Sequence, residues 1–386
     1  MLCHGFYAFH PLADCSSAPI CGATSRTFGR CRGSGRAVGG SFGPAADAVP
    51  LYFQVGRLTM TYAPRIVRKT MIDAATYPLL SRLSEIGRVP SAIRTVARQY
   101  RDVHADHRGA AVRYVLLDCS GTTMDRYVDA PALVFVDVFA AFGVAITMQE
   151  AREPMGLRKD LHIQRLTQIP SVAAKWAAAH GKNPDQSDVD AMFALFVPRQ
   201  LALLRTGIYA QLLPGVAEVT QQLQARGVKL GVTTGFTRAM LDILLEAARD
   251  QGFAPDTSVA GDEVESPRPK PFMVLKNLER LGVYNVANAM RLTVKVDDTI
   301  SGVGEGAPLC WNVAVSRWGN YVVDSCAHAA TLTDEQLEAA TLRAKERLVR
   351  ESTAHYVIDD LRDLPPVLAD IDRRLADGES PWTARG

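Results

Sequence analysis

The sequence predicts an α/β fold in which a parallel β-sheet carries helices on both faces and is interrupted once by an all-helical insertion. Short apolar runs bounded by Gly or Asp alternate with segments whose apolar residues recur at helical spacing, which is typical of a parallel sheet. After the first run, about ninety residues show helical spacing alone, although a connection between strand and helix needs far fewer. The predicted strands are residues 112–117, 228–232, 257–260, 292–296, 312–315 and 355–358, and the predicted helices between them include 216–225, 238–251, 272–281 and 333–351.

Composition and charge make a soluble enzyme the default expectation. Of the 386 residues, 47% are hydrophobic and 22% are charged, as in ordinary globular proteins. The formal net charge of +2 gives no electrostatic reason to expect nucleic acid as a partner. No run of eighteen uncharged apolar residues occurs, so no transmembrane segment is predicted. The seven cysteines match no zinc pattern, which indicates reduced thiols in an intracellular protein.

The N-terminal part of the chain differs from the rest. Residues 1–72 contain eight Arg and Lys but only two acids, and they lack periodic apolar positions. This bias suits either a targeting segment of a mitochondrial protein or a disordered extension of a cytoplasmic one. Residues 73–108 show helical spacing and are predicted to be a helical lead-in, either packed on the enzyme or lying on a membrane surface.

The remaining chain divides into a predicted core and an insertion. Residues 109–125 and 215–372 form the predicted α/β core, and residues 126–214 form the helical insertion, which we call the cap. Ligands of parallel sheets bind beyond the carboxyl ends of the strands. The residues that follow each predicted strand are therefore the candidates for a functional site.

The first strand ends in the string D-C-S-G-T-T-M-D at residues 118–125. Asp118 enters a turn whose Gly and Thr amides can face an anion, although a single Asp could equally cap a helix. The whole pattern D-x-x-G-T-T-x-D resembles the first motif of the haloacid dehalogenase superfamily. The resemblance implies that Asp118 is a nucleophile that takes up a phosphoryl group. Because nucleophile and phosphate are both anionic, this chemistry needs a hard cation with oxygen ligands, which describes Mg²⁺.

Phosphate-binding groups are expected after the next strands. The second strand ends in T-T-G, which resembles the second motif of the superfamily and implies that the Thr234 hydroxyl and the Gly235 amide bind phosphoryl oxygens. Alternating prolines around Arg268 hold that cation in an extended segment, where it could neutralise the transferring group. Lys270 is the competing candidate for this role.

Two acids, Asp297 and Asp298, follow the strand predicted at 292–296. Two adjacent carboxylates cost electrostatic energy unless a cation binds between them. This strand exit is therefore suited to completing a metal site.

The informative segment of the cap is residues 153–162. If this segment is helical, Met155, Lys159 and His162 share one face. A lysine beside a methionine and a histidine can be partly desolvated, which lowers its pKa and provides the neutral amine that attacks a carbonyl. A solvated helix lysine is the alternative interpretation.

The string M-G-L-R-K-D-L-H at residues 155–162 resembles the cap signature of the phosphonoacetaldehyde hydrolase (phosphonatase) family. Further matches are T-T-G-F-T-R-A-M at 233–240, R-P before Pro271, G-V-Y at 282–284 and K-V before the acids that follow the fourth strand. The resemblance covers residues 112–370. It implies a Rossmann-like parallel sheet with an inserted helical cap, a Mg²⁺-dependent hydrolase and a homodimer formed through the caps.

The resemblance also implies a mechanism. Lys159 would form a Schiff base with the aldehyde of phosphonoacetaldehyde, and Asp118 would attack phosphorus, so that acetaldehyde and phosphate are released. Ordinary phosphatases of the superfamily carry an acid where this chain has Ser120, and an imine-activated leaving group does not need that acid. The implied binding residues for substrate and phosphate are Met155, His162, Thr234, Gly235 and Arg268, and the implied metal ligands are Asp118, Ser120 through its backbone carbonyl, and Asp298.

Four positions depart from the family pattern. Gly302 stands where the family has a second acid of the metal site, and Asp297 stands where it has glycine. As a strand neighbour of Asp298, Asp297 is expected to point elsewhere. Phe236 replaces a tyrosine and Val128 replaces a cysteine. These departures leave three readings: a working phosphonatase, a related hydrolase or phosphatase with a shifted substrate, or a weakened homologue that binds without efficient turnover.

Overall fold

The computed structural model describes residues 111–283, 285–307 and 309–383. The extension predicted for residues 1–72 and the lead-in predicted for residues 73–108 lie outside these ranges, and both stay predictions. In the described part of the chain, no helix is long and apolar enough to cross a membrane.

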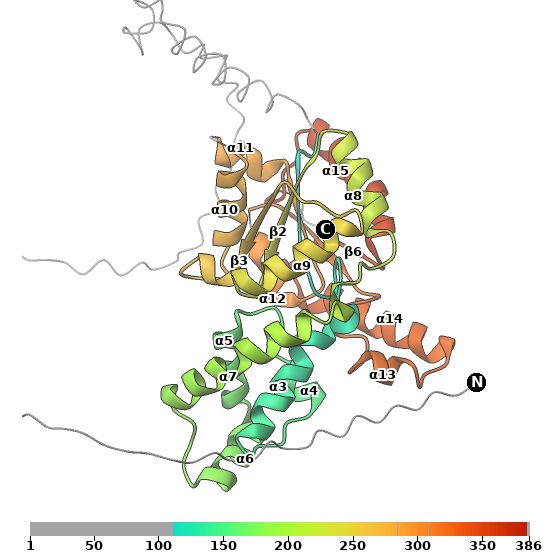
Figure 1. Cartoon of the computed structure of the whole chain (residues 1–386). Helices are drawn as coiled ribbons and strands as arrows, with labels where there is room; N and C mark the ends of the chain where they lie inside the picture. The colour runs from blue at the N-terminus through green and yellow to red at the C-terminus, as the bar shows by residue number, and fades with distance from the viewer. Residues whose placement is uncertain (1–110, 284, 308, 384–386) are drawn as a thin grey trace, which may run out of the picture. The chain divides into compact units, whose positions relative to one another are not determined.

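A six-stranded parallel sheet forms the centre of the fold (Figure 1), with strand order β3-β2-β1-β4-β5-β6. The predicted α/β fold class is thereby confirmed, and each predicted strand is present to within two residues. The strands are β1 (Tyr114–Leu117), β2 (Lys229–Thr234), β3 (Thr257–Ala260), β4 (Thr293–Asp297), β5 (Trp311–Val315) and β6 (Tyr356–Ile358).

The register of the three central strands aligns their carboxyl ends. Leu117 is paired with Val232 of β2 on one side and with Val296 of β4 on the other. The residues that follow these pairs are Asp118, Thr233 and Asp297. Polar side chains that lie far apart in the sequence therefore meet at one edge of the sheet.

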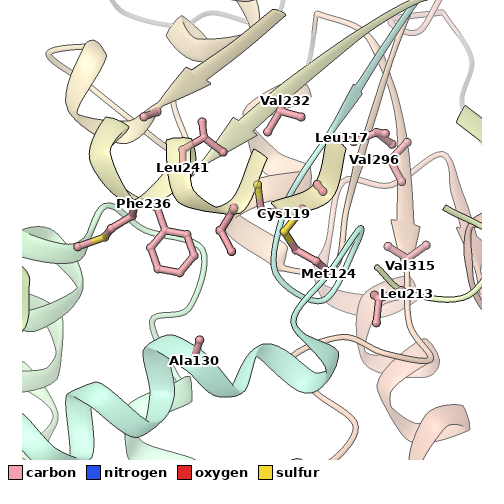
Figure 2. Packing of buried hydrophobic residues seen from close by; sticks show 14 of the residues in the cluster. Leu117, Cys119, Met124, Ala130, Leu213, Val232, Phe236, Leu241, Val296 and Val315 are labelled. Carbon is pink, nitrogen blue, oxygen red and sulfur yellow. The ribbon is translucent and has the colours of Figure 1, made fainter. Parts of the chain in front are cut away.

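Both faces of the sheet are covered, as the alternation of side chains along a strand requires. Val115 and Leu117 pack with one set of helices, and Figure 2 shows Leu117, Val232, Val296 and Leu241 in that core. Tyr114 contacts residues of a second set on the other face. The first set is α8 (Val216–Ala225), α9 (Arg238–Asp250) and α15 (Leu364–Ala376), and the second is α10 (Phe272–Arg280), α11 (Val286–Arg291), α12 (Ile300–Gly306) and α14 (Asp334–Glu351). A short helix, α13 (Cys326–Ala329), precedes α14.

Between β1 and β2 the described chain contains helices only (Figure 1). Phe135 of α3, Ile163 of α5 and Phe196 of α7 are fully buried in one hydrophobic cluster. Trp176 of α6 is buried in the same cluster. The helices of this insertion are α3 (Asp129–Ala141), α4 (Met148–Arg152), α5 (Lys159–Gln168), α6 (Pro170–His180) and α7 (Gln186–Leu204), with short 3-10 turns at Arg126–Val128 and Ile208–Ala210.

The expectation that residues 153–162 form a single helix is wrong. Helix α4 ends at Arg152 and α5 begins at Lys159. Gly156 lies between them with φ of +94°, a left-handed conformation that ends a helix and that glycine adopts without strain. Met155 consequently lies in the connecting turn, whereas Lys159 begins a new helix.

Candidate active site

Asp118 leaves β1 at the centre of the sheet and is 5% exposed. The loop after it folds back, because the Thr123 hydroxyl donates to the carbonyl of Asp118 at 2.9 Å. Gly121 turns this loop with φ of +79°, and a Cβ at this position would lie 2.4 Å from Oδ2 of Asp298. Glycine is therefore required here both by the turn and by the approach of a second acid.

Arg268 is the cation that contacts Asp118. Its Nη2 lies 2.6 Å from Oδ1 of Asp118 and 3.1 Å from Oδ2 of Asp297, and its Nε lies 3.0 Å from Oε2 of Glu305. Burial opposes the charge of Arg268, but Asp297 and Asp118 hold its pKa well above the usual range. Lys270 is exposed. Of the two competing cations, the structure brings Arg268 to the nucleophile.

Three acids converge at the ends of β1 and β4. Asp118, Asp297 and Asp298 are buried, and one carboxylate oxygen of each lies within 4.8 Å of the others. The expectation that Asp297 points elsewhere is wrong. Asp297 is the last residue of β4, and its Oδ1 accepts hydrogen bonds from the backbone N and the hydroxyl of Thr299, which turn its carboxylate toward the site.

This group of acids has the chemistry of a magnesium site. Oδ2 of Asp298 accepts a hydrogen bond from the backbone N of Asn320 at 2.7 Å, whereas Oδ1 is buried without a hydrogen-bond partner among the described residues. A buried carboxylate oxygen without a partner is costly unless a cation binds it. An all-oxygen donor set of this kind suits Mg²⁺.

Burial and mutual repulsion make these acids reluctant to ionise. Burial, with the charge of Asp297, raises the pKa of Asp118 to about 6, although Arg268 opposes the shift. Burial also raises the pKa of Asp298 well above its usual range, with further contributions from Asp297 and Asp118. A divalent cation among them would favour the ionised forms.

Lys159, the first residue of α5, is 4% exposed. Its Nζ lies 4.7 Å from the centroid of the Phe236 ring and 5.7 Å from that of Phe135. Burial lowers the pKa of Lys159 to about 8; the Asp118 carboxylate opposes the shift and Arg268 supports it. A lysine in this setting provides a substantial fraction of neutral amine near neutral pH.

Asp118 and Lys159 line one small pocket, which encloses about 20 Å³, room for about one water molecule. The cap contributes one wall and the sheet contributes the other. All predicted site residues other than His162 are in its lining. The lining residues are Asp118, Ser120, Val128, Pro131, Met155, Gly156, Lys159, Thr234, Gly235, Phe236, Arg268, Asp298 and Thr299.

The turn between α4 and α5 closes this pocket by packing on the core. The Ser301 hydroxyl donates to the carbonyl of Met155 at 3.2 Å, and Arg268 Nη1 donates to that of Gly156 at 3.4 Å. A Cβ on Gly235 would lie 2.4 Å from the carbonyl oxygen of Leu157. On the outer side of the turn, a cleft of about 740 Å³ shares Met155 with the pocket.

Unlike the other predicted site residues, His162 does not line the pocket, and its contact with the substrate stays a prediction. Its ring is fully buried, stacks on Phe135 with centroids 3.9 Å apart, and lies 2.9 Å through Nε2 from the carbonyl oxygen of Ala151. Burial, together with Lys159, lowers its pKa well below the usual range. Because Lys159 starts a new helix, His162 turns into the cap core and holds α5 against α3.

Three buried polar residues near the pocket were given no role from the sequence: Glu305, and also Lys295 and Asp125, which entered only as letters of the matched strings. Lys295 Nζ lies 2.7 Å from Oδ2 of Asp297, and Glu305 accepts a hydrogen bond from the Thr233 hydroxyl at 2.9 Å. The available signals were a lysine inside the mostly apolar strand at 293–296 and the last acid of the string at 118–125. Asp125 is also buried, and burial raises its pKa to about 7 although the backbone N of Ala130 donates to it.

The chain matches known proteins over this whole region. A model of haloacid dehalogenase-like hydrolases matches residues 112–308. Phosphonoacetaldehyde hydrolase from Paraburkholderia phytofirmans is 39% identical over 70% of this chain and 99% of its own length. The enzyme of the same name from Nitratidesulfovibrio vulgaris is 40% identical over 71% of this chain and 95% of its own length. A solved phosphonoacetaldehyde hydrolase-like protein from Oleispira antarctica superposes with a TM-score of 0.65 at 36% identity, over 70% of this chain and 96% of that one.

Proposed function

The chain belongs to the phosphonoacetaldehyde hydrolase family of haloacid dehalogenase-like hydrolases, and from this we propose that it cleaves the carbon–phosphorus bond of phosphonoacetaldehyde. The products would be acetaldehyde and phosphate. The observation that carries the proposal is the shared pocket of Lys159 and Asp118. It brings together an amine with a pKa of about 8 and a carboxylate paired with Arg268.

The proposed reaction begins at the aldehyde. The neutral amine of Lys159 adds to the aldehyde carbon and water leaves, so that a protonated imine forms. Oδ of Asp118 then attacks phosphorus, and the electrons of the carbon–phosphorus bond move into the imine to give an enamine. Protonation of the enamine carbon and addition of water release acetaldehyde and regenerate Lys159. A second water cleaves the aspartyl-phosphate to phosphate and Asp118.

Other residues would hold the phosphonate during transfer. The Thr234 hydroxyl, the Gly235 amide and Arg268 would bind its oxygens and balance their charge. Met155 would cover the reacting carbon. Mg²⁺, held by the carboxylates of Asp118 and Asp298 and the carbonyl of Ser120, would neutralise the repulsion between the nucleophile and the phosphonate.

Ser120 distinguishes this proposal from a general phosphatase. Phosphate esters release an alkoxide, which must be protonated, and a serine hydroxyl at this position cannot act as an acid of suitable strength. An imine accepts the electrons directly and needs no such acid. A related hydrolase with a shifted substrate and a homologue that only binds remain the alternatives that the test must separate.

The test is acetaldehyde release from phosphonoacetaldehyde, with and without Mg²⁺. We expect Mg²⁺-dependent release of equal amounts of acetaldehyde and phosphate. Borohydride should trap a covalent adduct on Lys159, and Lys159→Arg should abolish both the adduct and turnover. A folded wild-type protein that forms no adduct would contradict the proposed mechanism, and phosphate release from simple esters alone would favour a shifted substrate.

A homodimer formed through the cap and the cellular location belong to the same proposal. The homodimer rests on the family resemblance, and the cellular location rests on the N-terminal composition. Light scattering of the purified chain measures the first, and fractionation of cells that express the full chain measures the second.

A further inference from the structure

Glu305 is a fully buried acid that the proposed reaction does not use. It lies in α12, and its Oε1 has no hydrogen-bond partner among the described residues. A buried charge with an unpartnered oxygen costs more free energy than an apolar side chain of the same size would. Packing alone therefore does not explain an acid at this position.

The other carboxylate oxygen of Glu305, Oε2, accepts two hydrogen bonds. The Thr233 hydroxyl donates to it at 2.9 Å, and Arg268 Nε donates to it at 3.0 Å. The two donors are also joined to each other, because Arg268 Nη2 donates to the hydroxyl and to the carbonyl of Thr233 at 2.9 Å each. Glu305, Thr233 and Arg268 thus form a closed ring of hydrogen bonds beside Asp118, which Arg268 contacts.

This ring determines how the guanidinium of Arg268 is oriented. The group is planar and its N–H bonds point in fixed directions. Nε carries a single hydrogen, and among the described residues it donates that hydrogen to Glu305. Holding Nε sets the rotation of the whole group, and thereby the direction in which Nη2 reaches Oδ1 of Asp118 at 2.6 Å. Without this acceptor the group would keep its charge but would be free to turn away from the nucleophile.

We propose that Glu305 is a positioning residue, which holds the Arg268 guanidinium in the rotation that places it beside both Asp118 and the transferring phosphonate group. This inference rests on the proposed function and deepens it. Glu305 acts through Arg268 and Thr233, since it is not among the residues that line the pocket. The role requires its hydrogen-bonding oxygen rather than its negative charge.

Two variants of the purified full-length chain separate the hydrogen bonds from the charge and from packing. Glu305→Gln keeps an oxygen acceptor of the same reach and removes the charge, and its amide nitrogen can take the place of the oxygen that has no partner. Glu305→Met keeps about the same volume, which avoids a cavity, and provides no comparable acceptor. Two steps are measured with phosphonoacetaldehyde: borohydride trapping at Lys159 reports imine formation, and acetaldehyde release also requires cleavage of the carbon–phosphorus bond.

The two steps should respond differently in Glu305→Met. Acetaldehyde release should be slower than in wild type by on the order of a hundredfold, the scale expected when a group at the reacting atoms is misplaced by about 1 Å. Trapping at saturating aldehyde should stay within about threefold of the wild-type rate, because the hydrogen bonds of Glu305 do not involve Lys159. Glu305→Gln should release acetaldehyde at a rate within about fivefold of wild type, since it keeps the acceptor.

The orientation of Arg268 can also be measured without turnover. In NMR spectra of an isotope-labelled sample, the Nε–H signal of Arg268 is assigned by its loss in Arg268→Lys. This hydrogen should exchange slowly with solvent, because a buried carboxylate accepts its hydrogen bond. The slow exchange should persist in Glu305→Gln and should become at least about tenfold faster in Glu305→Met.

Asn277→Leu is the matched control. Asn277 is also fully buried, and it links α10 to β2 because its Nδ2 donates to the carbonyls of Met273 and Val232 at 3.0 Å each. Its Oδ1 likewise has no partner among the residues that the structure describes. None of its hydrogen bonds involves Arg268. Its loss should lower stability and leave both rates and the Arg268 signal as in wild type.

Two results would overturn the inference. The first is acetaldehyde release by Glu305→Met at the wild-type rate, and the second is an equal loss in Glu305→Met and Glu305→Gln, which would assign the effect to the charge. If Glu305→Met does not fold, Thr233→Val decides in its place, because it removes the hydroxyl that joins Glu305 to Arg268. It should slow release and leave trapping unchanged, and release at the wild-type rate would contradict the role.

Failure of the proposed function would look different from failure of this inference. In that case a wild-type chain whose Arg268 Nε–H exchanges slowly would neither form an adduct on Lys159 nor release acetaldehyde.

Discussion

Lys159 and Arg268 line the same pocket, yet their surroundings shift their pKa values in opposite directions. Carboxylates contact Arg268 directly and keep it charged. Lys159 lies against Phe236 and Phe135, where burial outweighs the attraction of Asp118 and lowers its pKa to about 8. Arg268 is thereby held as a permanent cation, as its proposed role at the phosphonate requires, while Lys159 can lose its proton, as its proposed attack on the aldehyde requires.

This difference predicts the pH dependence of imine formation. Because the folded-state pKa of Lys159 lies near 8, the neutral amine increases as pH rises and reaches its full amount only above that value. The rate of borohydride trapping at saturating aldehyde should rise about tenfold per pH unit below pH 7 and level off above pH 8 to 9. Trapping measured by mass spectrometry across this range is the check. A flat profile between pH 6 and 8 would show that the proton on Lys159 does not limit the step.

At the residue scale, the sequence predicted the identities of the site better than their orientations. Asp118, Arg268, Asp298 and Lys159 meet as expected, because strand ends and motif spacing determine where they lie. The direction of Asp297 depends on hydrogen bonds from Thr299 and on an empty position at Gly302, which lies on another element. Contacts of this kind arise only when the elements pack together.

At the scale of the elements, the turn between α4 and α5 joins the cap to the pocket that Asp118 and Lys159 line. Strands were predictable because buried apolar runs mark them, and their ends were correct to within two residues. The break at residues 153–158 was not predicted, since the segment keeps helical spacing across Gly156. Helix α12 was also missed, because its sequence contains three glycines, and glycine is a poor helix former.

Gly156→Ala should impair catalysis more than it impairs folding. A Cβ at position 156 would lie 2.3 Å from the Ser301 hydroxyl and 2.5 Å from that of Thr299, which would push the turn away from the sheet. Because of this clash and the positive φ of Gly156, we expect the variant to lose about 1–3 kcal/mol of unfolding free energy and at least tenfold in kcat/KM.

Gly181→Ala provides the matched control for this variant. Gly181 also lies in the cap and has φ of +70°, but a Cβ there would meet nothing within 4 Å. It should show the backbone cost of about 1 kcal/mol with normal kinetics. Denaturant unfolding and steady-state assays of both variants measure the two effects. Equal kinetic losses in the two variants would contradict a specific role for the turn.

At the scale of the whole molecule, the proposed binding of Mg²⁺ by the acids at the sheet edge would link stability to metal binding. Asp118, Asp297 and Asp298 repel one another when the site holds no cation, and burial increases this cost. A ligand that binds only the folded state stabilises it by about 2.7 kcal/mol at a hundredfold excess over its Kd.

Magnesium should therefore raise the thermal stability of the folded region. We expect the melting temperature to rise steadily with Mg²⁺ concentration in the wild-type chain, and to fall again when a chelator is added. Asp298→Asn should lose most of this dependence, because it removes the negative charge of the acid whose Oδ1 has no hydrogen-bond partner among the described residues. Scanning calorimetry at fixed ionic strength separates this effect from general salt stabilisation. An unchanged melting temperature at millimolar Mg²⁺ would contradict the assignment of the acids.

The pocket of about 20 Å³ also has a consequence for how fast the enzyme can work. A molecule that carries both an aldehyde and a phosphonate cannot diffuse into a space that holds about one water. The turn that contains Met155 separates this space from the outer cleft, so we expect the turn to move aside when substrate enters and product leaves. Solvent viscosity resists such a motion but not the breaking of a bond. We therefore expect turnover to fall as solvent viscosity is raised, because motion of the turn would contribute to the rate together with the chemistry proposed at Asp118.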